Sequence, residues 1–247
     1  MMYMWKYSRR PEMDRARLKT LILYHIYSSK VLVGILLLIM FVNLLLGIAF
    51  KHSINSAGSM DIASYIFAMF VGYELFREVF AFSMINGVSR KTYYISNILS
   101  TIIISVFLGV TTGVVSFISS VLANNSIMFY MIYPKNTANM FIWCTVMTYA
   151  IISLFHFISL VMYRISKKTK YIIILLLALS VPFIILVNNL AGGFIMHIHK
   201  FLFLFLGISG SGADITADPI LSSAVLFVFS AVITAVSWLF LRKAEAR

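Results

Sequence analysis

Residues 73–97, YELFREVFAFSMINGVSRKTYYISN, separate two long apolar runs at 61–80 and 95–122. Glu74, Arg77 and Glu78 close the first run, and Arg90 opens the second. Charges that stand only between apolar runs are typical of a turn at a membrane surface, where ionised side chains cost much less than at the bilayer centre.

The composition of the chain is that of a membrane protein. Of its 247 residues, 61% are hydrophobic and 11% are charged, whereas a soluble domain has about 25% charged residues. The single cysteine, Cys144, excludes an intrachain disulfide and a cysteine-only metal site.

The apolar runs predict an all-α membrane protein with six spans. A transmembrane helix needs about 20 largely apolar residues. The runs of sufficient length are 31–50, 61–80, 95–122, 138–163, 171–191 and 220–241.

The basic residues indicate which side of the membrane each end occupies. With six spans, 17 of the 20 lysines and arginines fall on the side of the two termini. Lys and Arg accumulate in cytoplasmic loops. We therefore expect a protein of the cell (plasma) membrane with both termini in the cytoplasm. The net charge of +12 is then explained by topology and anionic lipid, and no nucleic-acid partner is expected.

Three regions follow from this topology: a cytoplasmic N-terminal segment at 1–30, a transmembrane domain at 31–241, and a cytoplasmic tail at 242–247. Within the first, residues 11–30 carry Leu18, Ile22 and Ile26 at helical spacing. This pattern favours an amphipathic helix lying in the inner membrane interface; the alternative is that these residues are the frayed start of the first span.

Residues 194–206 are apolar but too short to cross the membrane, which is typical of a re-entrant or interfacial segment on the outer side. In the third span, Gly109 and Gly113 form a G-x-x-x-G pattern, which predicts a closely packed helix face.

The motifs for chemistry are sparse. No P-loop occurs, so we expect no nucleotide cofactor in this chain, and no cluster of metal ligands or catalytic groups is evident. His156 is the one ionisable residue well inside a predicted span.

Beyond Glu78 the opening stretch stays apolar through Phe80, Phe82, Met84 and Ile85 before Asn86-Gly87 turns the chain. A short helix with exposed aromatic side chains and a glycine stop predicts a docking surface for a groove on a soluble partner.

These features together resemble the type-2 ATP-binding-cassette transporter permeases of bacterial exporters, in particular the small stand-alone members without a fused ATPase. The sharpest local match is Asn86-Gly87-Val88-Ser89-Arg90-Lys91, which is similar to the G-[VT]-[ST]-R pattern of that family's first intracellular loop.

The resemblance implies that Phe80 to Gly87 is a coupling helix, with Arg77, Glu78 and Arg90 taking part in ATPase coupling, and that residues 194–206 form an outer hairpin. It also implies two ATPase subunits that bind ATP and magnesium, a second permease subunit of the same or a homologous kind, and export of an amphipathic or hydrophobic substrate, either peptide or lipid-like.

Two alternatives stay open. One is a membrane immunity or sensor subunit that binds peptide without transporting it, since a fold does not settle a function. The other is a membrane enzyme, which a polar, water-filled cavity around His156 would favour.

Overall fold

A computed structural model gives the three-dimensional arrangement of the chain. The residues that it describes are 11–49, 59–122, 129, 132–133, 137–165, 168–169, 171, 203, 205–209 and 216–242.

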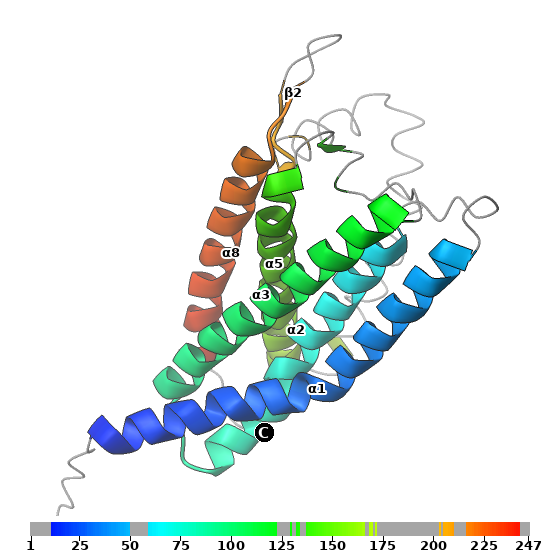
Figure 1. Cartoon of the computed structure of the whole chain (residues 1–247). Helices are drawn as coiled ribbons and strands as arrows, with labels where there is room; N and C mark the ends of the chain where they lie inside the picture. Colours follow the sequence, from blue (N-terminus) through cyan, green and yellow to red (C-terminus); the bar gives the residue numbers. More distant parts are fainter. Residues whose placement is uncertain are drawn as a thin grey trace, which may run out of the picture.

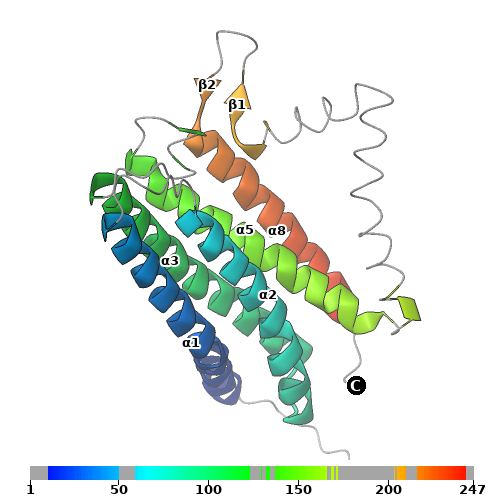
Figure 2. The same cartoon turned by 90° about the vertical axis from the view of Figure 1, so that its right-hand side faces the viewer.

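Five long helices run side by side in an elongated bundle (Figures 1 and 2). They are α1 (Pro11–Ala49), α2 (Ser59–Ile85), α3 (Arg90–Leu122), α5 (Thr137–Arg164) and α8 (Pro219–Arg242).

Four of these helices contain segments long and apolar enough to cross a membrane: Ala16–Val42, Arg90–Val121, Asn139–Arg164 and Pro219–Arg242. In α2 the apolar segment is the shorter stretch Ile62–Glu74. The chain is therefore a helical, membrane-embedded protein. The predicted span at 171–191 lies outside the described residues, apart from Tyr171.

Residues 11–30 do not form a separate helix, because α1 is continuous from Pro11 to Ala49. Figure 1 shows that its first half runs across the lower end of the bundle and that the helix then bends upward beside α2. The predicted interfacial segment and the first span are thus two halves of one bent helix.

Helix α5 lies at the centre of the bundle and packs against α2, α3 and α8. The main core surrounds the fully buried Trp143 of α5, whose ring lies 5.5 Å from that of Phe129 and 5.9 Å from that of Tyr133, centroid to centroid. Tyr65 of α2 meets the same indole edge-on. Aromatic residues therefore join the upper ends of α2 and α5.

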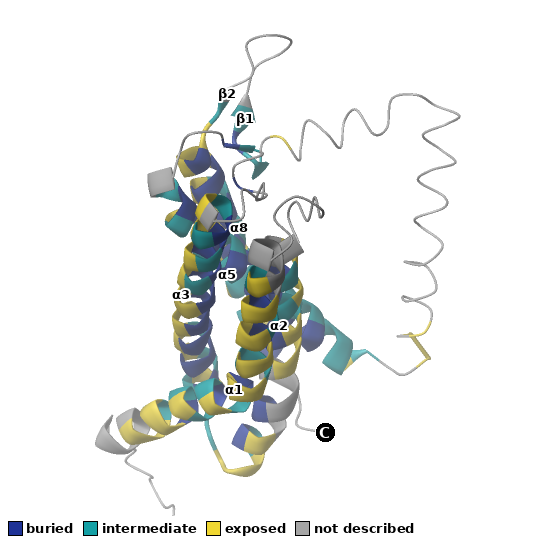
Figure 3. Ribbon diagram, turned by 45° about the vertical axis from the view of Figure 1, so that its right-hand side comes forward, coloured by how far each residue is buried: buried dark blue, intermediate teal, exposed yellow. Residues whose placement is uncertain are grey.

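The outward faces of the helices are apolar. Figure 3 shows exposed residues along the outer sides of α1, α2 and α3, and these include large side chains such as Leu38, Phe70 and Phe107. Contiguous apolar surface of this kind marks contact with lipid or with another protein, in agreement with the membrane-embedded character of the chain.

A short β-hairpin leads into α8 at the upper end of the bundle. Strands β1 (Ile208–Ser209) and β2 (Thr216–Ala217) pair antiparallel, with Ile208 opposite Ala217. Gly207, before β1, has a φ of 61°, and a Cβ there would lie 2.9 Å from the backbone nitrogen of Ser222.

The predicted outer hairpin at 194–206 lies outside the described residues except for Phe203, Phe205 and Leu206. Its end is tied to the bundle, because the Ser222 hydroxyl donates to the carbonyl of Phe205 (2.8 Å) and accepts a hydrogen bond from the Trp143 indole (3.1 Å).

Candidate functional site

The turn between α2 and α3 is built by the residues that carry the resemblance. The amide of Gly87 donates to the carbonyl of Met84 (3.1 Å), and the amide of Val88 donates to that of Ser83 (3.0 Å). Gly87 has a φ of 69°. This pair of bonds with a left-handed glycine is a Schellman C-cap, which satisfies carbonyls at the end of α2.

The next residues start α3. The Ser89 hydroxyl accepts a hydrogen bond from the Thr92 amide at 3.1 Å, the bond of an N-cap serine to the third residue of its helix. The Arg90 guanidinium donates to the backbone carbonyl of Arg242 at 2.6 Å. A cation at a helix C-terminus complements the helix dipole, so Arg90 fastens the end of α8 to the start of α3.

Phe80 does not lie on the surface as the sequence predicted. It has no exposed area, and its ring meets those of Tyr93 on α3 (5.3 Å between centroids) and Tyr163 on α5 (5.7 Å), both edge-on. The expectation that it is an exposed aromatic anchor is wrong, because this face of α2 points inward. Together with Val79, Tyr93, Leu160 and Leu241 it forms a buried group that we call the turn-side cluster.

The other apolar residues of the predicted coupling helix differ in their surroundings. Met84 is half-buried against the turn-side cluster. Phe82 is 47% exposed and stacks on Tyr24 of α1 at 4.9 Å, and Ile85 is 82% exposed. The exposed apolar surface at this turn therefore consists of Ile85 and one side of Phe82.

Residues 80–85 are the last turns of α2 and not a separate short helix. Arg77 and Glu78 also lie within α2, but their side chains are outside what the structure describes.

The two glycines of the third predicted span lie against α5. A Cβ at Gly109 would meet the backbone of Thr145, and one at Gly113 would lie 2.7 Å from the ring of Phe141. Gly72 of α2 faces α5 from another side, since a Cβ there would lie 2.5 Å from the Ile152 carbonyl oxygen. Glycines thus let both α2 and α3 approach the central helix closely.

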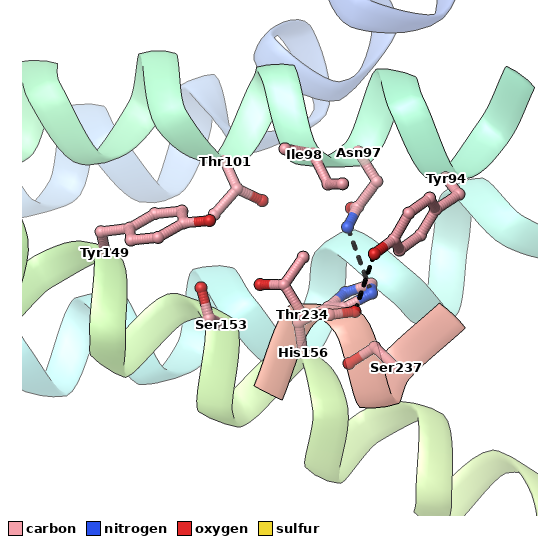
Figure 4. Close-up of a pocket in the computed structure, with 9 residues that line it drawn as sticks. All are labelled: Tyr94, Asn97, Ile98, Thr101, Tyr149, Ser153, His156, Thr234 and Ser237. Atoms are coloured by element: carbon pink, nitrogen blue, oxygen red, sulfur yellow. Dashed lines mark hydrogen bonds between the residues drawn. The ribbon is translucent and has the colours of Figure 1, made fainter. Parts of the chain in front are cut away.

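A polar cavity lies between α3, α5 and α8. Figure 4 shows that Asn97 points toward His156 and that the Tyr94 hydroxyl reaches the carbonyl of Thr234. The Asn97 amide nitrogen lies 3.2 Å from Nε2 of His156, and the Tyr94 bond is 2.8 Å long.

At this cavity, neither Oδ1 of Asn97 nor Oγ of Ser153 has a hydrogen-bond partner among the described residues. Both side chains are 5% exposed. The cavity has a volume of about 10 Å³, enough for one water molecule. A bound water that donates to both oxygens would satisfy them, whereas a peptide or lipid would not fit.

Many other buried hydroxyls on α3 are already satisfied. Ser100 donates to the Ser96 carbonyl, Ser105 to the Thr101 carbonyl and Thr112 to the Leu108 carbonyl, at 2.6 to 2.8 Å. Serine and threonine commonly bond to the carbonyl four residues earlier in this way. These hydroxyls therefore need no acceptor on a neighbouring helix.

Sequence reasoning identified His156 but missed Asn97 and Ser153. Ser153 lies one helical turn before His156, and this spacing was the available signal. Asn97 is 59 residues away from His156, so only the packing of α3 on α5 reveals that pair.

No known protein family, curated protein or solved structure matches this chain. The resemblance to transporter permeases therefore rests on the residues of the α2–α3 turn and on the arrangement of apolar segments.

Proposed function

We propose that the chain is the membrane subunit of an ATP-driven ABC exporter, and that a separate ATPase subunit binds the α2–α3 turn. The observation that carries the proposal is Ile85, a large apolar side chain 82% exposed at the tip of this turn. Ile85 is the last residue of α2, and the C-cap that follows it and the N-cap of α3 fix the backbone of the turn without burying its side chain.

The charges around the turn are consistent with a cytosolic partner. Arg90 and Lys91, at the start of α3, are exposed, and basic residues of this kind favour the cytoplasmic side of a membrane. An apolar residue within a basic rim would suit a groove with an apolar floor and acidic edges.

The turn-side cluster provides a route for movement. A force on Ile85 would act on the last turns of α2, where Phe80 is wedged between Tyr93 of α3 and Tyr163 of α5. Because packed cores shift between discrete arrangements and do not deform smoothly, α2, α3 and α5 would move together. Arg77 and Glu78 remain proposed participants in this coupling.

In this proposal two ATPase subunits supply ATP, magnesium and hydrolysis, and a second permease subunit completes the pathway. The substrate class is an amphipathic or hydrophobic molecule, either peptide or lipid-like. The one-water cavity beside His156 is too small for such a molecule, and we propose a pathway between two permease subunits.

Photo-crosslinking tests the partner directly. A benzophenone amino acid is placed at Ile85 in the full chain in its native membrane, and another at Leu38, an exposed apolar residue of α1 far from the turn. We expect Ile85, but not Leu38, to crosslink to a protein with a nucleotide-binding P-loop. A crosslink from Ile85 only to lipid would refute the proposal.

A functional test follows from the same surface. Ile85→Asp should abolish co-purification of the ATPase and its stimulation by substrate. Ile220→Asp makes the same substitution at a residue that is 61% exposed at the start of α8, at the opposite end of the bundle from the turn (Figure 1), and should leave both unchanged. An intact, stimulated complex with Ile85→Asp would show that the turn is not the docking site.

Peptide binding without transport is the second candidate. It is favoured by the small size of the cavity beside His156, because a subunit that does not transport needs no pathway through its bundle. Substrate-stimulated ATPase activity in sealed vesicles separates the two functions: a transporter subunit supports it, and a peptide-binding immunity or sensor subunit does not.

A further inference from the structure

A second cavity lies between α1 and α3, and it shares no lining residue with the polar one. It has a volume of about 360 Å³ and an almost entirely apolar lining. Val33, Gly34 and Leu37 of α1 form one wall, and Ile103, Ile104 and Phe107 of α3 form the other. We call it the α1–α3 groove.

The groove is chemically polarised along α1. Lys30 lines the part nearer the start of α1, together with Ile26 and Ser29, and no charged residue is among the described residues that line it farther along α1. The Lys30 ammonium lies 3.4 Å from the centroid of the Tyr27 ring, and both side chains are exposed. The described residues that line the groove include no acidic side chain.

The apolar part of the groove fits within one membrane leaflet. From Lys30 to Leu37 its wall on α1 extends about 10 Å at the rise of an α-helix. Half of the hydrocarbon core is about 15 Å thick. A cationic rim joined to an apolar wall of this length is complementary to an anionic headgroup joined to an acyl chain.

We propose that the α1–α3 groove is a binding site for one anionic phospholipid of the leaflet on the side of the α2–α3 turn. Lys30 binds the phosphate, with Tyr27 at the level of the headgroups, and one acyl chain lies along Gly34 between Val33 and Phe107. A phospholipid brings an anionic phosphate to Lys30, whereas a helix of a second copy of the chain need not bring an anionic group there.

Gly34 provides a variant that fills the groove without distorting the helix. An added Cβ at Gly34 meets no atom within 4 Å, so a leucine there projects into open space. Replacing a helical glycine also stabilises the helix. Loss of lipid in Gly34→Leu could therefore not be attributed to unfolding. Leu38→Phe, on an exposed part of α1 that does not line the groove, is the matched control.

The test is native mass spectrometry of the purified full chain, after exchange into detergent with added phosphatidylglycerol or phosphatidylcholine. We expect the natural chain and Leu38→Phe to retain one phosphatidylglycerol, and Gly34→Leu to lose it. Lys30→Gln should lower retention of phosphatidylglycerol about fivefold, the effect of one basic residue near anionic lipid, and leave phosphatidylcholine unchanged.

Equal retention by Gly34→Leu and the natural chain would overturn the proposal. Dissociation of a dimer by Gly34→Leu, with no change in bound lipid, would also overturn it and would assign the groove to a second copy of the chain. Neither readout depends on an ATPase, so this site stands or fails separately from the proposed exporter function.

Discussion

Replacing Gly109 with alanine is expected to destabilise the contact between α3 and α5. The added Cβ would lie 2.7 Å from both the backbone nitrogen and Oγ1 of Thr145. Non-bonded heavy atoms prefer about 3.5–4.0 Å, so the helices would have to separate by roughly 1 Å. Overpacking of this kind costs about 1–3 kcal/mol, which for a chain of this size lowers the unfolding temperature by about 2–12 °C.

Gly34→Ala is the control, because its Cβ meets nothing within 4 Å. Both substitutions contribute the same gain in helix propensity, about 0.5–1 kcal/mol. The difference between the two unfolding temperatures therefore isolates the steric cost at the interface of α3 and α5.

Cys144 makes the measurement possible without engineering. It is the only cysteine in the chain, it is buried, and it directly precedes Thr145. A thiol-reactive fluorescent dye added to the protein in detergent will label it only as the bundle opens, so the rise in fluorescence on heating gives the unfolding temperature. If Gly109→Ala unfolds at the same temperature as Gly34→Ala, the close approach of α3 to α5 at Gly109 is wrong.

The same thermal assay checks three further predictions. Gly87→Ala should lower the free energy of unfolding by about 1–2 kcal/mol, because φ is 69° there and alanine is strained in the left-handed region. A smaller loss for Gly87→Asn would confirm this cause, and equal losses would contradict it. Phe80→Ala should lower the free energy of unfolding by about 3–5 kcal/mol, because the ring is fully buried, whereas Ile85→Ala should change it by less than about 0.5 kcal/mol. A larger loss for Ile85→Ala than for Phe80→Ala would refute the observed burial. Asn97→Leu should lower the free energy of unfolding by about 1–3 kcal/mol, because it removes the bond to His156. Ser100→Ala should lower it less, because the Ser100 hydroxyl bonds within its own helix. A smaller loss for Asn97→Leu than for Ser100→Ala would show that the pair of Asn97 and His156 does not stabilise the fold.

Sequence patterns located the helices well because polarity changes sharply at their ends. The predicted run 220–241 corresponds to α8, Pro219–Arg242. Its start is fixed locally, since the Asp218 carboxylate accepts a hydrogen bond from the Ile220 amide at 2.8 Å and Pro219 occupies the first helical position, where its missing N–H is not needed. Such signals are short-range and can be read from a single sequence.

The environment of individual side chains could not be read in the same way. Phe80, Phe82 and Ile85 occur in one apolar stretch of 73–97, yet only Phe80 is fully buried. The outcome depends on which face of α2 meets α3 and α5. Contacts between helices far apart in the sequence determine that face, and in a membrane the outward face is apolar too, so hydrophobic periodicity is a weak guide.

The structure of the α2–α3 turn offers a second explanation for the motif that resembles transporter permeases. Gly87 and Ser89 act as a C-cap and an N-cap, and any tight connection between two antiparallel helices would favour such residues. The short motif is therefore explained by local structure whether or not an ATPase binds. Capping does not explain Ile85, because a C-cap motif needs no exposed isoleucine two residues before its glycine. The function of the turn is accordingly best tested at Ile85, where a partner gains contact area and the isolated fold gains little.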